Sequence, residues 1–221
     1  MPAFRLMSAG LLALAAAGLT AALGGLVAPD TAVRDWFVER RSPTLTAVLT
    51  GFTTIGSSAV LASLALGITV WLGATRHRDE ALLVAGTTAG ALILWPLLKN
   101  LVARARPDDA HLVLVNSWAY PSGHSLTSTA VLGVLAVLAY RRVRSRPARV
   151  AIAVSGVALI GAVGVSRVYL GVHWPTDVLA GWLVGALWLA VCLWAHDRLA
   201  RGRSAADPAQ QRERQHAQRG E

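Results

Sequence analysis

The sequence is poor in charge and almost lacks two residue types, cysteine and lysine. Only 15% of its 221 residues are charged, whereas about a quarter is usual for a soluble domain. Hydrophobic residues make up 54% of the chain and form runs long enough to cross a bilayer, which disfavours a soluble helical bundle. The single cysteine, Cys192, lies within an apolar run. An intrachain disulfide is therefore excluded, and we expect a small buried side chain at this position.

Six apolar segments predict an all-α fold, namely a polytopic membrane protein with a six-transmembrane-helix bundle. Several are shorter than the ~20 residues of an untilted span, so their ends are expected to extend into the flanking loops. The first segment, which follows Arg5, also has features of a signal peptide, but its length and the weak cleavage site before Pro29 favour a retained helix. The segments are residues 6–28, 57–74, 80–98, 125–140, 150–165 and 178–195.

This length suits one domain, which we place at residues 1–200. Residues 201–221 are rich in arginine and glutamine and show no apolar period. They predict a basic, disordered cytoplasmic tail or one loosely held at anionic headgroups. Between the first two segments, Trp36 and Phe37 are expected on an interfacial helix packed against the bundle.

The formal charge of +9 is better explained by membrane topology than by nucleic acid. With the N-terminus inside, 14 basic residues fall on inner segments and 7 on outer ones. Basic residues collect on cytoplasmic loops, so this bias predicts an N-in/C-in protein of the plasma membrane. The loops after the third and fifth spans then share the extracytoplasmic face. We expect a lipid bilayer and no nucleic acid as partner.

The first polar cluster on that face is Lys99 followed by Arg106 and Pro107. Lys99 is the only lysine among 21 cationic residues. Lysine contacts phosphate as a compact point charge, whereas arginine offers a planar fork, so the two are not interchangeable. The alternative interpretation is a cation that extends from a helix end toward the membrane interface.

The second cluster is the Pro-Ser-Gly-His sequence at residues 121–124, directly before the fourth span. Free backbone N–H groups at a helix start bind anions, and Gly123 permits an oxyanion to approach closely. His124 can exchange a proton near neutral pH. The alternative is an ordinary N-cap at Ser122 with a surface histidine.

The third cluster contains Ser166, Arg167, His173 and Asp177. A spacing of four brings the histidine and the carboxylate together on one helical turn, although Pro175 lies between them. A carboxylate on one imidazole nitrogen fixes the tautomer and leaves the other nitrogen free as a nucleophile or base. The alternative is a purely structural hydrogen bond.

These clusters lie far apart in sequence, and topology brings them to one face. Cations, histidines, an acid and a glycine-serine turn are the groups that phosphoryl transfer by positioning and electrostatics requires. Ionisable groups at membrane depth are candidates for function. The residues therefore predict a phosphoryl-transfer site.

The order Lys-x6-Arg-Pro, Pro-Ser-Gly-His and Ser-Arg-x5-His-x3-Asp resembles the tripartite signature of the type 2 phosphatidic acid phosphatase superfamily. The resemblance extends from about residue 6 to residue 195 and implies a metal-independent lipid phosphatase without a cofactor. Asp108 and Asp109 are accordingly interpreted as solvated loop charges rather than magnesium ligands.

The resemblance also implies a role for each matched residue. His173 attacks phosphorus and forms a phosphohistidine, with Asp177 orienting its ring. His124 protonates the leaving oxygen and then activates water. The phosphate oxygens are held by Lys99, Arg106, Arg167, Ser122 and the backbone N–H of Gly123.

Three functions are compared from the sequence. The first is hydrolysis of undecaprenyl diphosphate to undecaprenyl phosphate, which suits an outward-facing site. The second is hydrolysis of a glycerolipid phosphate (phosphatidylglycerophosphate, phosphatidic acid or diacylglycerol diphosphate), or transfer of its phosphoryl group to an alcohol. The third is a transporter or lipid-binding protein, which gives no reason for the pairing of His173 with Asp177. Vanadate-dependent haloperoxidases share the constellation but are soluble.

Overall fold

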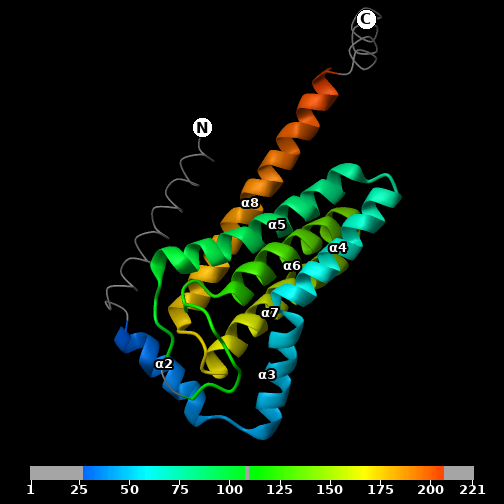
Figure 1. Ribbon diagram of the computed structural model, residues 1–221. Helices are drawn as coiled ribbons and strands as arrows, with labels where there is room; N and C mark the ends of the chain where they lie inside the picture. Colours follow the sequence, from blue (N-terminus) through cyan, green and yellow to red (C-terminus); the bar gives the residue numbers. More distant parts are fainter. Residues whose placement is uncertain (1–26, 108–109, 207–221) are drawn as a thin grey trace, which may run out of the picture.

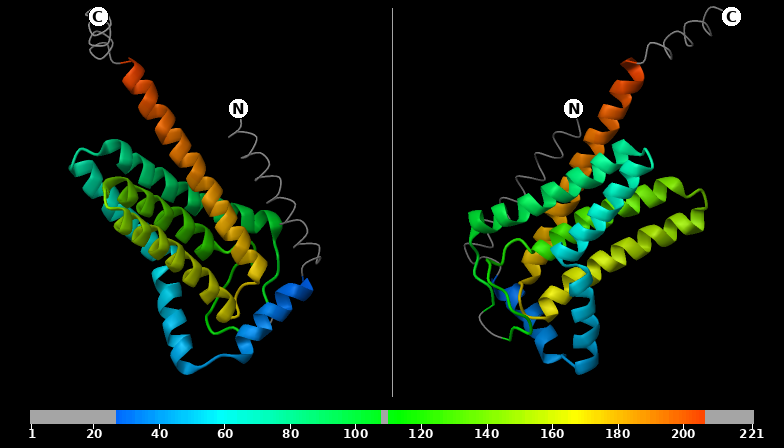
Figure 2. Two further views of the ribbon diagram at one scale, coloured as in Figure 1. Left: turned by 180° about the vertical axis from the view of Figure 1, so that it is seen from behind. Right: turned by 45° about the vertical axis from the view of Figure 1, so that its right-hand side comes forward.

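The computed structural model describes residues 27–107 and 110–206, and all secondary structure in these ranges is helical. Helices α4 to α8 run alongside one another, while α2 and α3 lie at one end (Figures 1 and 2). The expected all-α fold is thus confirmed for the described chain. The helices are α2 (Val27–Glu39), α3 (Pro43–Ile55), α4 (Ser58–Ala74), α5 (Arg78–Val102), α6 (Gly123–Arg142), α7 (Arg146–Tyr169) and α8 (Pro175–Ala206).

Four of these helices, α5 to α8, are long and apolar enough to cross a membrane. Helix α4 has 17 residues and meets α3 at a bend of 45°, so that the two together form a possible fifth span. The described chain is therefore a multi-pass membrane protein. Each expected segment from residue 57 onward coincides with one helix from α4 to α8. Residues 6–26 of the first expected span lie outside the described residues.

Helix α6 occupies the middle of the bundle and contacts α4, α5, α7 and α8. Two glycines of α8 let this helix approach the start of α6 closely. A Cβ atom at Gly181 would lie 2.7 Å from the carbonyl oxygen of Ser122, and one at Gly185 would lie 2.6 Å from that of Leu126. Because only glycine fits at these distances, α8 packs directly against the start of α6.

Local sequence signals fix the helix ends near the site. The hydroxyl of Ser122 accepts a hydrogen bond from the backbone N–H of Ser125 and caps α6. Helix α5 ends where Ala103 adopts a left-handed conformation (φ 48°), and α8 begins at Pro175, which needs no intrahelical donor there. These ends place the two loops between them at one end of the bundle.

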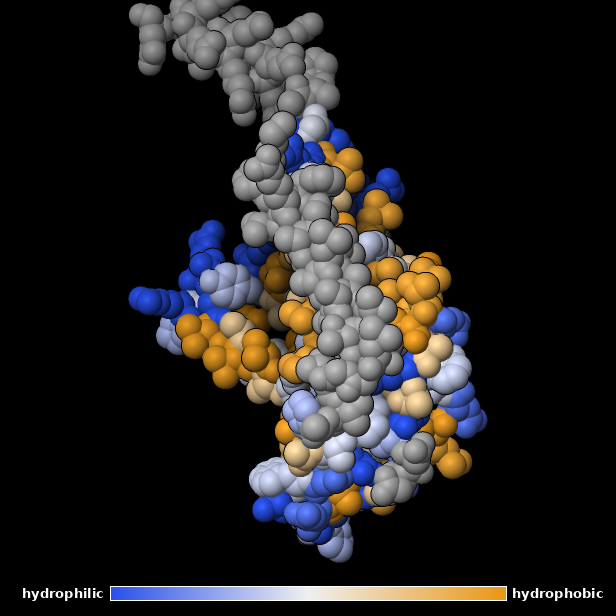
Figure 3. Space-filling view, turned by 90° about the vertical axis from the view of Figure 1, so that its left-hand side faces the viewer, coloured by the Kyte–Doolittle hydropathy of each residue, from blue (hydrophilic) through white to orange (hydrophobic). Residues whose placement is uncertain are grey.

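The expected interfacial helix corresponds to α2, which carries Trp36 and Phe37 in an edge-to-face contact with ring centroids 5.0 Å apart. It packs against α7 and α8. In Figure 3 the lower end of the molecule, where α2 lies, is largely hydrophilic, whereas apolar residues gather over the middle. At the other end α8 continues to Ala206, beyond the expected start of the tail at residue 201, and residues 207–221 lie outside the described residues.

Candidate active site

The site forms where the α5–α6 and α7–α8 connections meet beside α2 and α3 (Figure 2). The backbone N–H of Leu112 donates to the carbonyl of Leu170 at 3.0 Å, and that of Ser122 donates to the carbonyl of Asp177 at 2.9 Å. These two hydrogen bonds tie the first connection to the second. The three polar clusters predicted from sequence are therefore brought together at one end of the bundle.

His173 and Asp177 are buried, with 2% and 0% of their surfaces exposed. The imidazole Nδ1 lies 3.4 Å from Asp177 Oδ2, which also accepts the backbone N–H of Trp174 at 2.9 Å. On the other side of the ring, Nε2 lies 3.2 Å from a guanidinium nitrogen of Arg106. Because the carboxylate accepts a hydrogen bond from the protonated Nδ1, the lone pair lies on Nε2 and points toward the cations.

The electrostatics of the site keep this imidazole neutral. Burial, followed by the charges of Arg106, Arg167 and Lys99, lowers the pKa of His173 well below its usual 6.5. A buried ring surrounded by cations disfavours a further positive charge. His173 therefore retains an unprotonated nitrogen at neutral pH, which is what a nucleophile requires.

Two of the predicted phosphate-binding cations are oriented by the α5–α6 connection. Lys99, 4% exposed, donates to the carbonyl of Trp118 and lies 3.4 Å from the hydroxyl of Ser117. Arg106 donates to the carbonyls of Ser117, Trp118 and Val172. Burial lowers the pKa of Arg106, yet a guanidinium stays protonated in proteins. Arg106 thus provides a fixed positive charge beside His173, and Lys99 is held by the same Ser117 and Trp118 groups.

Arg167 extends from the end of α7 and is 4% exposed. One terminal nitrogen donates to the hydroxyl of Thr53 on α3 at 2.6 Å. Its buried Nε has no hydrogen-bond acceptor among the described residues. A buried donor without a partner is uncommon, and this N–H remains able to donate to a ligand oxygen. Sequence reasoning missed Thr53, because nothing in the pattern around it distinguishes it from the other threonines of that segment.

For the second cluster, two interpretations were given: an anion-binding turn, or an ordinary N-cap with a surface histidine. Its residues differ in which of the two they match. The Ser122 hydroxyl, fully buried, caps α6 and accepts from Ser125, as the simpler interpretation expects. Gly123 is the first residue of α6, and a Cβ there would meet the Trp95 ring at 3.2 Å. His124 is half-buried and lies within electrostatic reach of Lys99, Arg106 and Arg167.

Sequence reasoning also missed two charged residues, Asp30 and Arg104. Arg104 lies 2.7 Å from a carboxylate oxygen of Asp177 and 2.7 Å from one of Asp30 on α2. A buried arginine between two buried carboxylates forms a network that no local motif reveals. The only sequence signal was a third cation, two residues before Arg106, in a segment that already contains Lys99 and Arg106.

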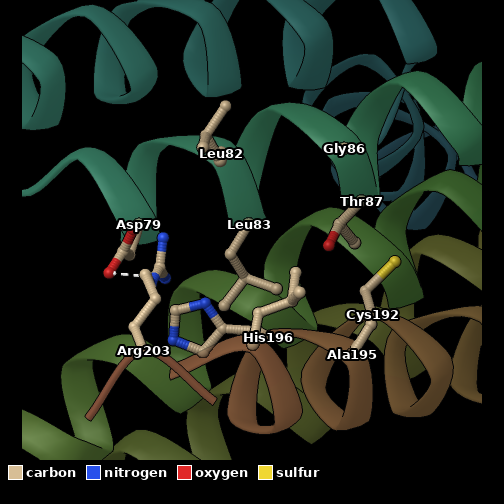
Figure 4. Close-up of a pocket in the computed structure, with 10 residues that line it drawn as sticks. Asp79, Leu82, Leu83, Gly86, Thr87, Cys192, Ala195, His196 and Arg203 are labelled. Carbon is tan, nitrogen blue, oxygen red and sulfur yellow. Dashed lines mark ion pairs between the residues drawn. The ribbon is translucent and has the colours of Figure 1, made fainter. Parts of the chain in front are cut away.

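No group of three or more histidine, cysteine, aspartate or glutamate residues within 27–107 and 110–206 is arranged to hold a metal ion. Asp108 and Asp109 lie outside the described residues. A pocket between α5 and α8 lies at the opposite end of the bundle (Figure 4). Its lining, which includes Asp79, His196 and Arg203, contains none of the predicted site residues.

Fold and side-chain chemistry together indicate a phosphoryl-transfer enzyme built within a bundle of membrane helices. The family model described as the PAP2 superfamily matches residues 80–201, which is more than half of the chain, and the protein belongs to this superfamily. It is a phosphatase of lipid phosphates or diphosphates, as the sequence predicted.

Curated relatives span much of the chain. Phosphatidylglycerophosphatase B of Bacillus subtilis is 36% identical over 160 residues, which cover 72% of this chain and 78% of that protein. Decaprenylphosphoryl-5-phosphoribose phosphatase of Mycobacterium tuberculosis is 30% identical, with coverage of 73% and 85%. Undecaprenyl-diphosphatase of Sulfolobus acidocaldarius is 35% identical over 107 residues, with coverage of 45% and 47%.

The solved structures include a close match in fold. The crystal structure of a transmembrane PAP2-type phosphatidylglycerolphosphate phosphatase from Bacillus subtilis has a TM-score of 0.80 and 28% identity, and covers 87% of this chain and 96% of that one. The structure of LpxE from Aquifex aeolicus matches with a TM-score of 0.56 at 22% identity, which is a likeness of fold alone.

Proposed function

We propose that this enzyme hydrolyses a lipid phosphate without a metal ion, through a phosphohistidine formed on Nε2 of His173. One observation carries the proposal. The imidazole is held by a buried carboxylate at Nδ1, while Nε2 faces the guanidinium of Arg106. A phosphate bound by the cations would therefore take the place of the Arg106 nitrogen against the Nε2 lone pair.

In the first step the Nε2 lone pair forms a bond to phosphorus, and the bond between phosphorus and the lipid oxygen breaks. His124, which takes up a proton from solvent once the phosphate dianion is bound beside it, gives that proton to the lipid oxygen. In the second step His124 takes a proton from water, whose oxygen attacks phosphorus and releases inorganic phosphate, so that His173 is regenerated. Asp177 stabilises the positive charge that develops on the ring in both steps.

The charge around the site matches a phosphate. Lys99, Arg106 and Arg167 lie around His173, and Arg104 is neutralised by the two carboxylates that it contacts, Asp30 and Asp177. With neutral histidines, four cations and two carboxylates leave an excess of two positive charges. A phosphate monoester dianion balances this excess, and the cations stabilise the charge that spreads over its oxygens in the transition state.

For the lipid, we favour phosphatidylglycerophosphate. The support is the relative from Bacillus subtilis, which matches over 78% of its length, together with the structural likeness to a phosphatidylglycerolphosphate phosphatase. Undecaprenyl diphosphate, the first choice from sequence, is the second candidate, and the shorter match to an undecaprenyl-diphosphatase supports it. Both lipids present a terminal phosphate to the same cations.

We further propose that the complete chain has six spans, with both termini inside, and that the site faces outward at the plasma membrane. The excess of basic residues on the inner segments supports this orientation. Single cysteines in a Cys192→Ser background test it. In intact cells an impermeant maleimide should label Leu114→Cys in the 99% exposed loop near the site and should not label Ser145→Cys in the α6–α7 connection. The reverse pattern would invert the topology.

The activity is tested with purified protein in detergent containing EDTA. Phosphatidylglycerophosphate and undecaprenyl diphosphate are supplied at equal concentrations, separately and in competition, and phosphate release is measured. The wild type should turn over phosphatidylglycerophosphate faster, and a radiolabelled phosphate should be trapped on protein in an acid-labile, base-stable linkage. His173→Ala should abolish both signals.

The exposed His77, which precedes α5 at the opposite end of the bundle, offers a matched control. His77→Ala should retain full turnover and trapping. Activity that survives in His173→Ala would remove the nucleophile assignment, and loss of wild-type activity in EDTA would refute the metal-independent mechanism. Faster turnover of undecaprenyl diphosphate would reverse the order of the two substrates.

A further inference from the structure

Arg104 lies buried between two carboxylates that come from opposite parts of the chain. Its guanidinium is 2.7 Å from Asp30 Oδ2 and 2.7 Å from Asp177 Oδ1. The side chains of Arg104, Asp30 and Asp177 are 7%, 1% and 0% exposed. Asp30 belongs to α2 and lies outside the segment 80–201 that matches the PAP2 superfamily. Neither Asp30 nor Arg104 belongs to the three sequence clusters.

The contacts of Asp177 give this network a direct link to the proposed nucleophile. Its Oδ1 accepts from Arg104, while its Oδ2 faces His173 Nδ1 and accepts from the backbone of Trp174. Arg104 therefore fixes the rotation of the carboxylate whose other oxygen orients the imidazole. Displacement of a catalytic group by about 1 Å can lower a rate ~100-fold. The rotation of the Asp177 carboxylate therefore matters for catalysis.

Asp30 is itself held firmly. Both the backbone N–H and the hydroxyl of Thr176, next to Asp177, donate to its carboxylate. Arg104 also donates to the Thr176 hydroxyl at 2.7 Å. Helix α2 is thereby connected to the start of α8 through groups that are shared with the site.

The charges explain why two carboxylates contact one arginine. If Asp177 were the only partner of the buried guanidinium, the positive charge would offset the negative charge of that carboxylate. The interaction of Asp177 with the imidazole would then be weaker. Asp30 compensates the guanidinium, so Asp177 keeps negative charge for His173. Buried charges interact strongly at low dielectric, and removal of one partner leaves another uncompensated.

We propose that Asp30 and Arg104 are positioning residues that set the orientation and charge of Asp177 and, through it, the nucleophilicity of His173. This inference rests on the proposed function, because it assumes that His173 is the nucleophile. It makes α2 part of the catalytic apparatus rather than only a cover on the bundle.

The test compares Asp30→Asn, Arg104→Gln and the double variant in the full chain, with release of phosphate from phosphatidylglycerophosphate in detergent as the assay. Arg104→Gln should lower kcat about 100-fold and leave KM within about threefold, because the phosphate-binding cations are untouched. Asp30→Asn should lower kcat about tenfold. The double variant should be at least about fivefold faster than Arg104→Gln, because it no longer places two uncompensated carboxylates side by side.

The pH profile gives a second readout that a purely structural role would not move. In Arg104→Gln, Asp177 loses its adjacent cation and keeps Asp30 as a neighbour. The acid limb of kcat/KM should therefore move to higher pH, and the double variant should move it back. The charged and titratable groups that face Asp177 are Asp30, Arg104, His173, Lys99, Arg106 and Tyr120.

Arg203→Gln, at an exposed ion pair on the opposite end, is the matched control and should leave kcat and the pH profile unchanged. Independent effects that multiply in the double variant would overturn the inference, as would normal kcat per folded molecule in both single variants. If Arg104→Gln does not fold, the isosteric Asp30→Asn decides by its kcat and pH profile. If His173→Ala stays active, the proposed function fails; if only the positioning variants behave normally, this inference alone fails.

Discussion

Both ends of the helical bundle carry exposed arginine–carboxylate pairs, such as Arg40–Glu39 at the end of α2, but among the described residues only the site end also has buried ones. At the site end, Arg104 and its two carboxylates have side chains that are at most 7% exposed. At the other end, the side chains of Arg203 and Asp79 are 58% and 48% exposed (Figure 4). The Arg141–Asp197 and Arg142–Glu80 pairs of that end are likewise open to solvent.

The same chemistry therefore has different consequences at the two ends. An exposed pair gains little, about 0–1 kcal/mol, because water and salt screen it. A buried pair has a large desolvation cost, and the loss of one partner leaves a charge without compensation. Buried charge at the site end is thus better explained by chemistry than by stability, whereas the exposed arginines at the other end suit membrane orientation.

The largest effect that separates the two ends is expected for Asp177→Asn. The amide is a weaker acceptor for the His173 ring and cannot stabilise the positive charge that develops on it, so kcat should fall about 10³-fold. Asp197→Asn, on the same helix but at the exposed end, should stay at the wild-type rate. Phosphate release under saturating substrate measures both. Comparable losses in the two variants would refute the comparison.

A smaller loss is expected when the only lysine is replaced by arginine. Lys99 is buried, and its ammonium fits against the Trp118 carbonyl and the Ser117 hydroxyl. The larger planar group of arginine cannot take the same position, so Lys99→Arg should reduce kcat/KM about 100-fold although the charge is kept. The reciprocal change at the open end, Arg141→Lys, should be silent. Near-normal kcat/KM in Lys99→Arg would mean that charge alone suffices there.

The contrast between the ends also marks what the sequence could and could not predict. Long apolar runs predicted the positions of α4 to α8, because a span in lipid must satisfy its backbone internally and expose apolar side chains. Parity of the spans brought Lys99, His124 and His173 to one end, and the fold agrees. The first inference depends on the apolar length of each span, and the second depends on the fact that successive spans cross the bilayer in alternating directions.

The missed contacts depend on tertiary packing. Asp30 reaches Thr176 across 146 positions of sequence, and Thr53 reaches Arg167 across 114. Neither Asp30 nor Thr53 lies in a motif, and a short helix outside the long apolar runs gives no sign of which helices it will contact. Ser122 shows a related limit, because a serine before a helix serves equally as cap or ligand until its hydrogen bonds are known.

The pH dependence of stability should depend on the buried His173 at the site end. The pKa of His173 is well below 6.5 in the folded protein because of burial and nearby cations, so below about pH 6.5 the unfolded chain binds a proton that the folded chain does not. Stability is then lost as pH falls, by at most about 1.4 kcal/mol per pH unit, and this loss continues toward the folded-state pKa.

Thermal unfolding in detergent between about pH 7.5 and pH 5.5 measures this loss. His173→Gln should flatten the dependence, since glutamine does not titrate. An unchanged slope in His173→Gln would show that other groups dominate the acid response.

The smallest effect is expected at the pair between α5 and α8. Asp79 and Arg203 are 2.8 Å apart, near the start of α5 and the end of α8, roughly 30 Å along α5 from Lys99. Arg203→Gln should change the free energy of unfolding by less than about 1 kcal/mol, and moderate salt should remove even that difference, because screening already weakens an exposed pair. Phosphatase activity should be unaffected, since no predicted site residue lines this pocket. A loss of several-fold in kcat would couple the two ends through α5 or α8, and the distinction between buried charge for catalysis and exposed charge for orientation would then fail.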